Sequence, residues 1–191
     1  MTTINVEKHV QEQQQTQLKS RGIPRGGVDE LMWDVEDSSG NLLFKSGPGR
    51  FQLQAQQGQR PVLVTMELKS VYKMKWKVYR GQKPYTEDDL LFTVARPRGQ
   101  RRGTYNICMR GNEDPDFTLI FNHPRYAQSV ISHRGVIRAV ANETIHLCEP
   151  DEAMVTVSKG MDMAFVTSVF FMAFYHSDRI RQKYSATYIP V

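Results

Sequence analysis

The densest basic cluster of the sequence consists of four arginines, Arg96, Arg98, Arg101 and Arg102. A proline and two glycines lie within the same run, 96–103, which is typical of a connection between strands. A guanidinium group binds a phosphate through two parallel hydrogen bonds, so several of them on one loop favour a phosphate-bearing ligand. The alternative is a solvated turn that keeps a β-protein soluble. Four lysines would enlarge the cluster if they project from the same side: Lys69, Lys73, Lys75 and Lys77.

No catalytic or metal-binding motif accompanies the arginines. The five histidines follow no metal-ligand spacing and no HExxH pattern: His9, His123, His133, His146 and His176. A GxSxG elbow is also absent from the sequence. Cys108 and Cys148 have no CxxC spacing and are expected to be reduced thiols, while the acidic residues of 149–152 lack the spacing of a calcium loop. We therefore expect no enzyme activity, no metal and no cofactor.

Composition limits the class of protein further. The chain has 191 residues, of which 40% are hydrophobic, as expected for one soluble globular domain. Its formal net charge of +5 favours acidic partners, although a bias of this size also occurs without a polyanionic ligand. The first residues lack the apolar run of a secretory signal. The expected location is the cytoplasm, with membrane surfaces and the nucleus as further possibilities.

The N-terminal part of the chain differs in character from the remainder. Residues 1–27 are polar and contain a glutamine cluster, so they are expected to form a flexible arm. From residue 30 to 158, short stretches with two-residue periodicity alternate with turn formers, which is typical of an all-β domain. The expected strands are 31–36, 42–44, 50–55, 61–67, 75–80, 90–96, 104–110, 117–121, 136–141 and 154–158. In the strand 75–80, Trp76 and Val78 are expected on the buried face.

A second kind of element comes after these strands. Residues 161–176 are predicted to form a helix whose apolar side chains occupy every side, so it must be enclosed by protein or by lipid. Its uncharged part spans roughly 21 Å, less than the hydrocarbon thickness of about 30 Å. We therefore expect no transmembrane segment and place the helix inside a barrel formed by the strands, with membrane insertion as the alternative. Its buried contacts are assigned to Phe165, Val169, Phe170 and Phe174.

These segments, in this order, resemble the LURP-one-related family. The resemblance is carried by Asp34–Phe44, Lys75–Gly81, Leu91–Val94, Ile137–Val140 and Gly160–Phe165. It covers roughly residues 28–180 and implies a mainly β, tubby C-terminal-like fold that phospholipid scramblases share. That fold is a closed antiparallel barrel of about twelve strands around a hydrophobic C-terminal helix, here followed by a tail at 181–191.

The resemblance also carries expectations about function. It implies a non-catalytic binding or scaffold domain in stress or defence signalling, with anionic membrane lipids or a protein as the partner. Tubby domains bind phosphoinositides through external basic residues, which favours the arginine cluster as a lipid site. The alternative is a scramblase-like, membrane-associated protein whose C-terminal helix inserts into lipid. Specific nucleic-acid binding is not expected, because the sequence offers no recognition helix and no aromatic platform near the arginines.

Overall fold

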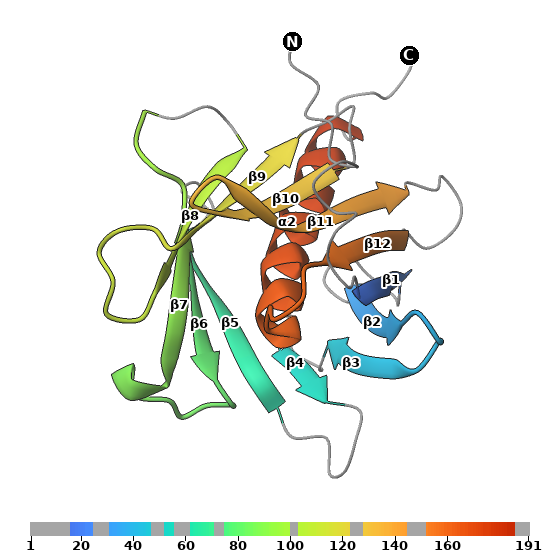
Figure 1. Cartoon of the computed structure of the whole chain (residues 1–191), viewed down its shortest axis with the longest axis horizontal. Helices are drawn as coiled ribbons and strands as arrows, with labels where there is room; N and C mark the ends of the chain where they lie inside the picture. The colour runs from blue at the N-terminus through green and yellow to red at the C-terminus, as the bar shows by residue number, and fades with distance from the viewer. Residues whose placement is uncertain are drawn as a thin grey trace.

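The structure is a computed structural model of the whole chain. The described residues are 16–24, 31–46, 52–55, 62–70, 75–99, 103–122, 128–144 and 152–185. Within them, the chain forms antiparallel strands and then one long α-helix (Figure 1). The strands are β1 (Thr16–Pro24), β2 (Leu31–Asp37), β3 (Leu42–Ser46), β4 (Gln52–Ala55), β5 (Val62–Ser70), β6 (Lys75–Arg80), β7 (Leu90–Ala95), β8 (Thr104–Met109), β9 (Phe117–Asn122), β10 (Gln128–His133), β11 (Val136–Thr144) and β12 (Glu152–Val157). The helices are the short 3-10 helix η1 (Glu87–Asp89) and α2 (Met163–Ser185).

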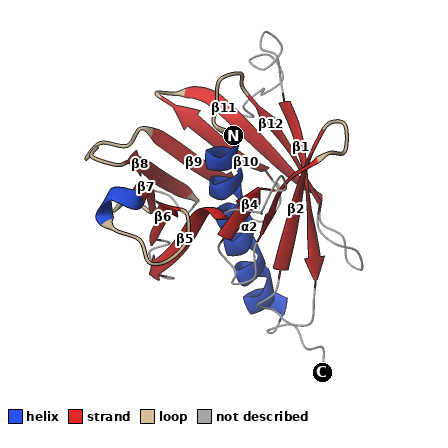
Figure 2. Ribbon diagram, turned by 90° about the horizontal axis from the view of Figure 1, so that it is seen from below, coloured by secondary structure: helices blue, strands red, loops and turns tan. Residues whose placement is uncertain are grey.

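Each strand pairs antiparallel with the strand that comes next in the chain. β1 pairs with β2 on one side and with β12 on the other, so the hydrogen-bonded order returns to its start as a closed barrel. In Figure 2, strands of the sheet lie on more than one side of helix α2. The expected class, a mainly β domain with a C-terminal helix, is confirmed.

Strand β6 illustrates how the sequence determines which face is buried. Trp76 and Val78 are 0% exposed, whereas Lys75 is exposed and Lys77 is half-buried. This alternation is the one predicted from the sequence, because successive side chains of a strand point to opposite faces. Tyr79 is buried as well, although it follows Val78 directly. Its ring stacks on the ring of Tyr85, 3.9 Å away, so a side chain from the next connection covers it on the outer face.

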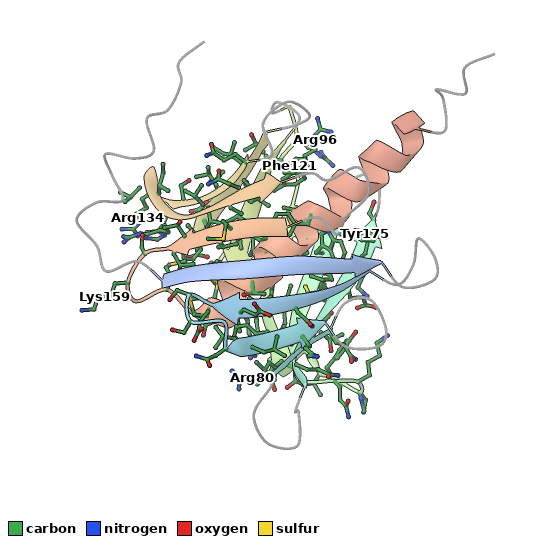
Figure 3. The ribbon with its side chains drawn as sticks, turned by 90° about the vertical axis from the view of Figure 1, so that its right-hand side faces the viewer. Arg80, Arg96, Phe121, Arg134, Lys159 and Tyr175 are labelled. Atoms are coloured by element: carbon green, nitrogen blue, oxygen red, sulfur yellow. The ribbon has the colours of Figure 1, made fainter. Side chains whose placement is uncertain are left out.

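Helix α2 fills the space that the strands surround. Val166, Val169 and Phe170 of the helix belong to the same buried cluster as the inward-facing residues of the strands. The ring of Phe165 lies 5.0 Å from the ring of Phe92 in β7, and Tyr175 lies near Trp76 in β6. The helix therefore runs along the inside of the sheet, and Figure 3 shows it leaving the barrel towards its C-terminus.

The helix begins and ends differently from the expected range of 161–176. It begins at Met163, and the Asp162 carboxylate caps its first turn by accepting a hydrogen bond from the Phe165 N–H at 2.7 Å. It continues to Ser185, so the charged residues at 178–181 lie within the helix and do not end it. Arginine, glutamine and lysine are good helix formers, and a charged segment can remain helical once it has left the apolar core.

Two strands were not predicted from the sequence. β1 lies within residues 16–24, where an arm was expected, so the sheet begins before the expected domain start at residue 28. β10 at 128–133 lies between the expected strands 117–121 and 136–141, where no strand was expected. β1 is mostly polar, and the two apolar residues of β10, Val130 and Ile131, are adjacent, so neither segment shows the alternation that predicts a strand. Their backbone N–H and C=O groups still pair with the neighbouring strands. The other residues of the expected arm lie outside the described residues. Of the tail expected at 181–191, residues 181–185 belong to α2 and residues 186–191 lie outside the described residues.

The two ends of the barrel differ in which connections they carry. Because consecutive strands are antiparallel, alternate connections lie at the same end. The helix-start end carries the connections 38–41, 81–89, 110–116, 134–135 and 158–162, the last of which leads into α2. The helix-exit end carries the connection 96–103 and the first residue of β6. Figure 3 shows Arg134 and Lys159 on the side of the barrel away from Arg96 and Tyr175.

Candidate functional site

The arginine cluster lies on the connection between β7 and β8, at the helix-exit end. Arg96 and Arg98 are both exposed. Arg101 and Arg102, the other two members of the predicted site, lie outside the described residues. The positive charge of Arg96 acts on the hydroxyl of Tyr105 in β8, where it opposes the rise in pKa that burial causes. The pairing of Ala95 with Asn106 puts Arg96 beside the start of β8, and the Arg96 side chain is exposed.

Gly103 attaches the end of this connection to β9. The Phe121 N–H donates a hydrogen bond of 2.6 Å to the Gly103 carbonyl. Gly103 has a φ of 96°, and a Cβ atom there would meet the backbone oxygen of Phe121. Glycine is therefore needed at this position for both its conformation and its lack of a side chain. The attachment holds the basic connection against the barrel wall.

Lys75 lies at the same end as the arginines, which the sequence could not show. The pairing of Trp76 with Val94 puts Lys75 beside the end of β7, where the chain leads into Arg96. Lys75 is exposed, as are Arg96 and Arg98. None of the three forms an ion pair with any described residue. The structure thus brings Lys75 of β6 to the same end of the barrel as Arg96 and Arg98 of the connection 96–103.

The remaining lysines of the expected basic surface behave differently. Lys69 Nζ lies 2.6 Å from Glu67 Oε2, and Lys77 Nζ lies 3.6 Å from Glu87 Oε1. The hydrogen bond between Lys69 and Glu67 lowers the pKa of the carboxyl and raises the pKa of the amine. These two lysines are therefore neutralised locally, and among the described residues of the expected basic surface the free positive charge lies at Lys75, Arg96 and Arg98. Lys73 lies outside the described residues.

An aromatic pair on the outer wall was missed by sequence reasoning. Tyr79 and Tyr85 stack at 3.9 Å with an angle of 10° between the ring planes, and the Lys83 ammonium lies 5.8 Å from the Tyr85 ring centre. Burial of the hydroxyl and the neighbouring Glu67 carboxylate raise the pKa of Tyr85 to about 12. The pair holds the connection 81–89 against β6. The only sequence signal for it is a tyrosine in a polar connection.

The acidic segment 87–89 forms the capped turn η1. The Thr86 hydroxyl accepts a hydrogen bond from the Asp88 N–H, and the Thr86 N–H donates to Asp89 Oδ2 at 2.7 Å. Hydrogen bonds from the backbone and side chain of Thr86 lower the pKa of Asp89. Most of the acidic segment 149–152 lies outside the described residues.

The residues assigned to the helix core all lie on α2. Val169, Phe170 and Phe174 are buried, and Phe165 is partly buried between the rings of Phe92 and Phe117. Among the described helices, none is long and apolar enough to cross a membrane.

Comparison with known proteins identifies the family. A sequence model of the LURP-one-related family matches residues 30–173, which is more than half of the chain. The chain therefore belongs to the LURP-one-related family, and the resemblance noted in its sequence is confirmed. No curated protein and no solved structure gave a significant match.

Proposed function

We propose that the protein is a non-catalytic binding domain that attaches to anionic phospholipids through the helix-exit end of its barrel. The observation that carries the proposal is the convergence of Lys75, Arg96 and Arg98 at one end, all exposed and none ion-paired to a described residue. Guanidinium and ammonium groups in this arrangement suit the phosphates of a lipid headgroup. Arg101 and Arg102, in the same connection of the sequence, add two further positive charges.

The expected strength of this attachment is modest. Each basic residue close to an anionic membrane contributes about 1 kcal/mol. A handful of such residues gives binding that is reversible and that weakens as salt screens the charges. Binding of this kind suits a protein that moves between the cytoplasm and a membrane surface, in keeping with a role in stress or defence signalling.

The interior of the barrel supports a role without catalysis. The largest side chains that are fully buried include Trp76 and Phe92 from the strands and Phe170 from the helix. They occupy the space in which a barrel protein would otherwise bind a small substrate. The same packing disfavours a scramblase-like protein with an inserting helix, because α2 would have to leave its contacts with the strands before it could enter lipid.

Vesicle flotation tests the proposal. The full chain is mixed with vesicles of phosphatidylcholine alone or with added phosphoinositide, at low and at high salt. We expect flotation only with the anionic lipid and at low salt, and a loss of at least tenfold in the triple variant Lys75→Ala/Arg96→Ala/Arg98→Ala. This factor corresponds to about 1.4 kcal/mol, well within what three such residues contribute.

The matched control removes three exposed cations from the other end of the barrel. The variant Lys83→Ala/Arg134→Ala/Lys159→Ala has the same change in net charge and should float like the unmodified chain. Equal flotation of both triple variants would remove the helix-exit end as the binding surface. A chain that never floats, but that still binds a protein through Arg98, would favour a protein partner instead.

A further inference from the structure

A second charged surface lies at the helix-start end, far from the proposed lipid site. Around this end the connections follow one another in the order 81–89, 110–116, 134–135 and 158–162. The first two contain six acidic residues and two basic ones. The next two contain Arg134 and Lys159, with Asp162 as their one acidic residue. The rim is therefore acidic over one part and basic over the adjoining part.

Most of these acidic side chains already have an ion-pair or hydrogen-bond partner in the same chain. Arg110 donates hydrogen bonds to the backbone and the carboxylate of Asp88, and Asp116 Oδ2 accepts a hydrogen bond from the Met109 N–H at 2.8 Å. Glu113 and Asp114 remain exposed, and neither forms an ion pair with a described residue. These two carboxylates carry the free negative charge of the rim.

The basic part is similarly free. Arg134 and Lys159 are exposed and form no ion pair with the described part of the chain. Figure 3 shows both on the same side of the barrel. Arg134 has a φ of 50° and Gly135 a φ of 79°, so they form a two-residue hairpin turn between the paired residues His133 and Val136. Such a turn is short and holds the guanidinium group of Arg134 outside the sheet.

Val136 adds an apolar element directly beside this turn. It is 52% exposed, and among the described residues only Met154 is another large hydrophobic side chain with comparable exposure. The acidic and basic parts also adjoin, because His133 Nδ1 lies 2.6 Å from the Asp116 carbonyl oxygen. The surface thus contains a free negative part, a free positive part and an exposed apolar side chain within neighbouring connections.

We propose that this end of the barrel pairs with the same end of a second copy of the chain around a two-fold axis. A two-fold interface uses one patch twice, so the patch must complement itself. Here Glu113 and Asp114 would face Arg134 and Lys159 of the second copy, while the two Val136 side chains lie near the axis. The basic helix-exit ends then point away from the interface and stay accessible to lipid.

The charges involved are exposed, so the dimer is expected to be weak and sensitive to salt. Exposed ion pairs contribute little individually, and ionic strength screens them further. Sedimentation velocity of the full chain, over a range of protein concentrations, should show a monomer–dimer equilibrium at low salt. Raising the ionic strength should shift the equilibrium to the monomer.

Charge reversal provides the sharper test. Arg134→Asp and Glu113→Arg should each abolish dimerisation when measured alone; aspartate is chosen because it tolerates a positive φ better than glutamate. An equimolar mixture of the two variants should dimerise again, because each copy then supplies the charge that the other lacks. The control Arg98→Glu makes the same charge change at the opposite end and should dimerise like the unmodified chain.

Several outcomes would overturn the proposal. These are a chain that stays monomeric at low salt, a dimer that both reversals leave intact, or a mixture that fails to restore association. If Arg134→Asp does not fold, as judged by circular dichroism, Lys159→Glu takes its place against the same Glu113→Arg partner. Failure of the dimer proposal can be distinguished from failure of the lipid proposal, because Arg98→Glu is expected to lose flotation with vesicles and to keep dimerisation.

Discussion

The indole ring of Trp76 meets the ring of Tyr175 edge-on, with ring centres 5.7 Å apart and planes at 85°. Trp76 comes from β6 and Tyr175 from α2, so the contact joins the barrel wall to the helix inside it. Edge-to-face aromatic pairs add about 0.5–1.5 kcal/mol to the free energy that burial provides. Trp76 is also completely buried, which makes it a sensitive position for stability.

Replacing Trp76 with alanine should lower the free energy of unfolding by about 3–5 kcal/mol, because the cavity and the lost apolar burial add together. Urea denaturation followed by circular dichroism measures the change. The neighbouring variant Lys75→Ala is the control and should shift stability by no more than about 0.5 kcal/mol, since this side chain is exposed. Similar losses for both variants would mean that the helix and the wall are not coupled through Trp76.

Two glycines of the basic connection form a matched pair. Gly99 has a φ of 77° and open space around it, whereas Gly103 has a φ of 96° and lies against the backbone of Phe121. Gly99→Ala should cost about 1–2 kcal/mol, the cost of a left-handed conformation alone. Gly103→Ala should cost clearly more, because the added methyl group must also displace β9. Thermal unfolding of the two variants checks the order, and equal shifts would show that the close approach to Phe121 is unimportant.

Much of the wall and the helix could be predicted from the sequence, because each depends on local periodicity. The alternation in Lys75–Arg80 correctly predicted that Trp76 and Val78 face the core. The apolar side chains on every side of 161–176 predicted an enclosed helix. Strand β1 was not predicted because it is mostly polar, and β10 was not predicted because its two apolar residues, Val130 and Ile131, are adjacent and do not alternate with polar ones. The helix end was not predicted, because the apolar pattern stops at residue 176 whereas the helix continues through charged residues to Ser185.

The candidate site was only partly accessible to sequence reasoning. The arginines could be found because they cluster along the chain. The position of Lys75 beside them depends on the register between β6 and β7, which no local pattern reveals. The same holds for Lys69 and Lys77, which resemble Lys75 in the sequence but are paired with carboxylates in the fold.

Tyr85 should make stability fall at alkaline pH. Its pKa of about 12 lies above the ordinary value of 10.0, so the folded chain holds the proton more tightly than the unfolded chain does. The stability that comes from this protonated hydroxyl is therefore complete below pH 10 and is lost as the pH rises towards 12. Tyr85→Phe should flatten this part of the profile. Absorbance titration of phenolate should also show one late-titrating tyrosine fewer in this variant.

The turn between β2 and β3 should give the opposite dependence, on the acid side. Asp37 accepts hydrogen bonds from the Asn41 side chain and from the backbone N–H groups of Asn41 and Ser39, all at 2.9 Å. The Asn41 side chain contributes most to lowering the pKa of Asp37. The stabilisation is therefore present above the unfolded pKa and is lost as the pH falls through the lower folded value. Asp37→Asn should be less stable than the unmodified chain at neutral pH, and the difference should shrink towards about pH 2. Denaturation midpoints across this range measure it; a difference that stays constant with pH would show that the charge of Asp37 does not stabilise the turn.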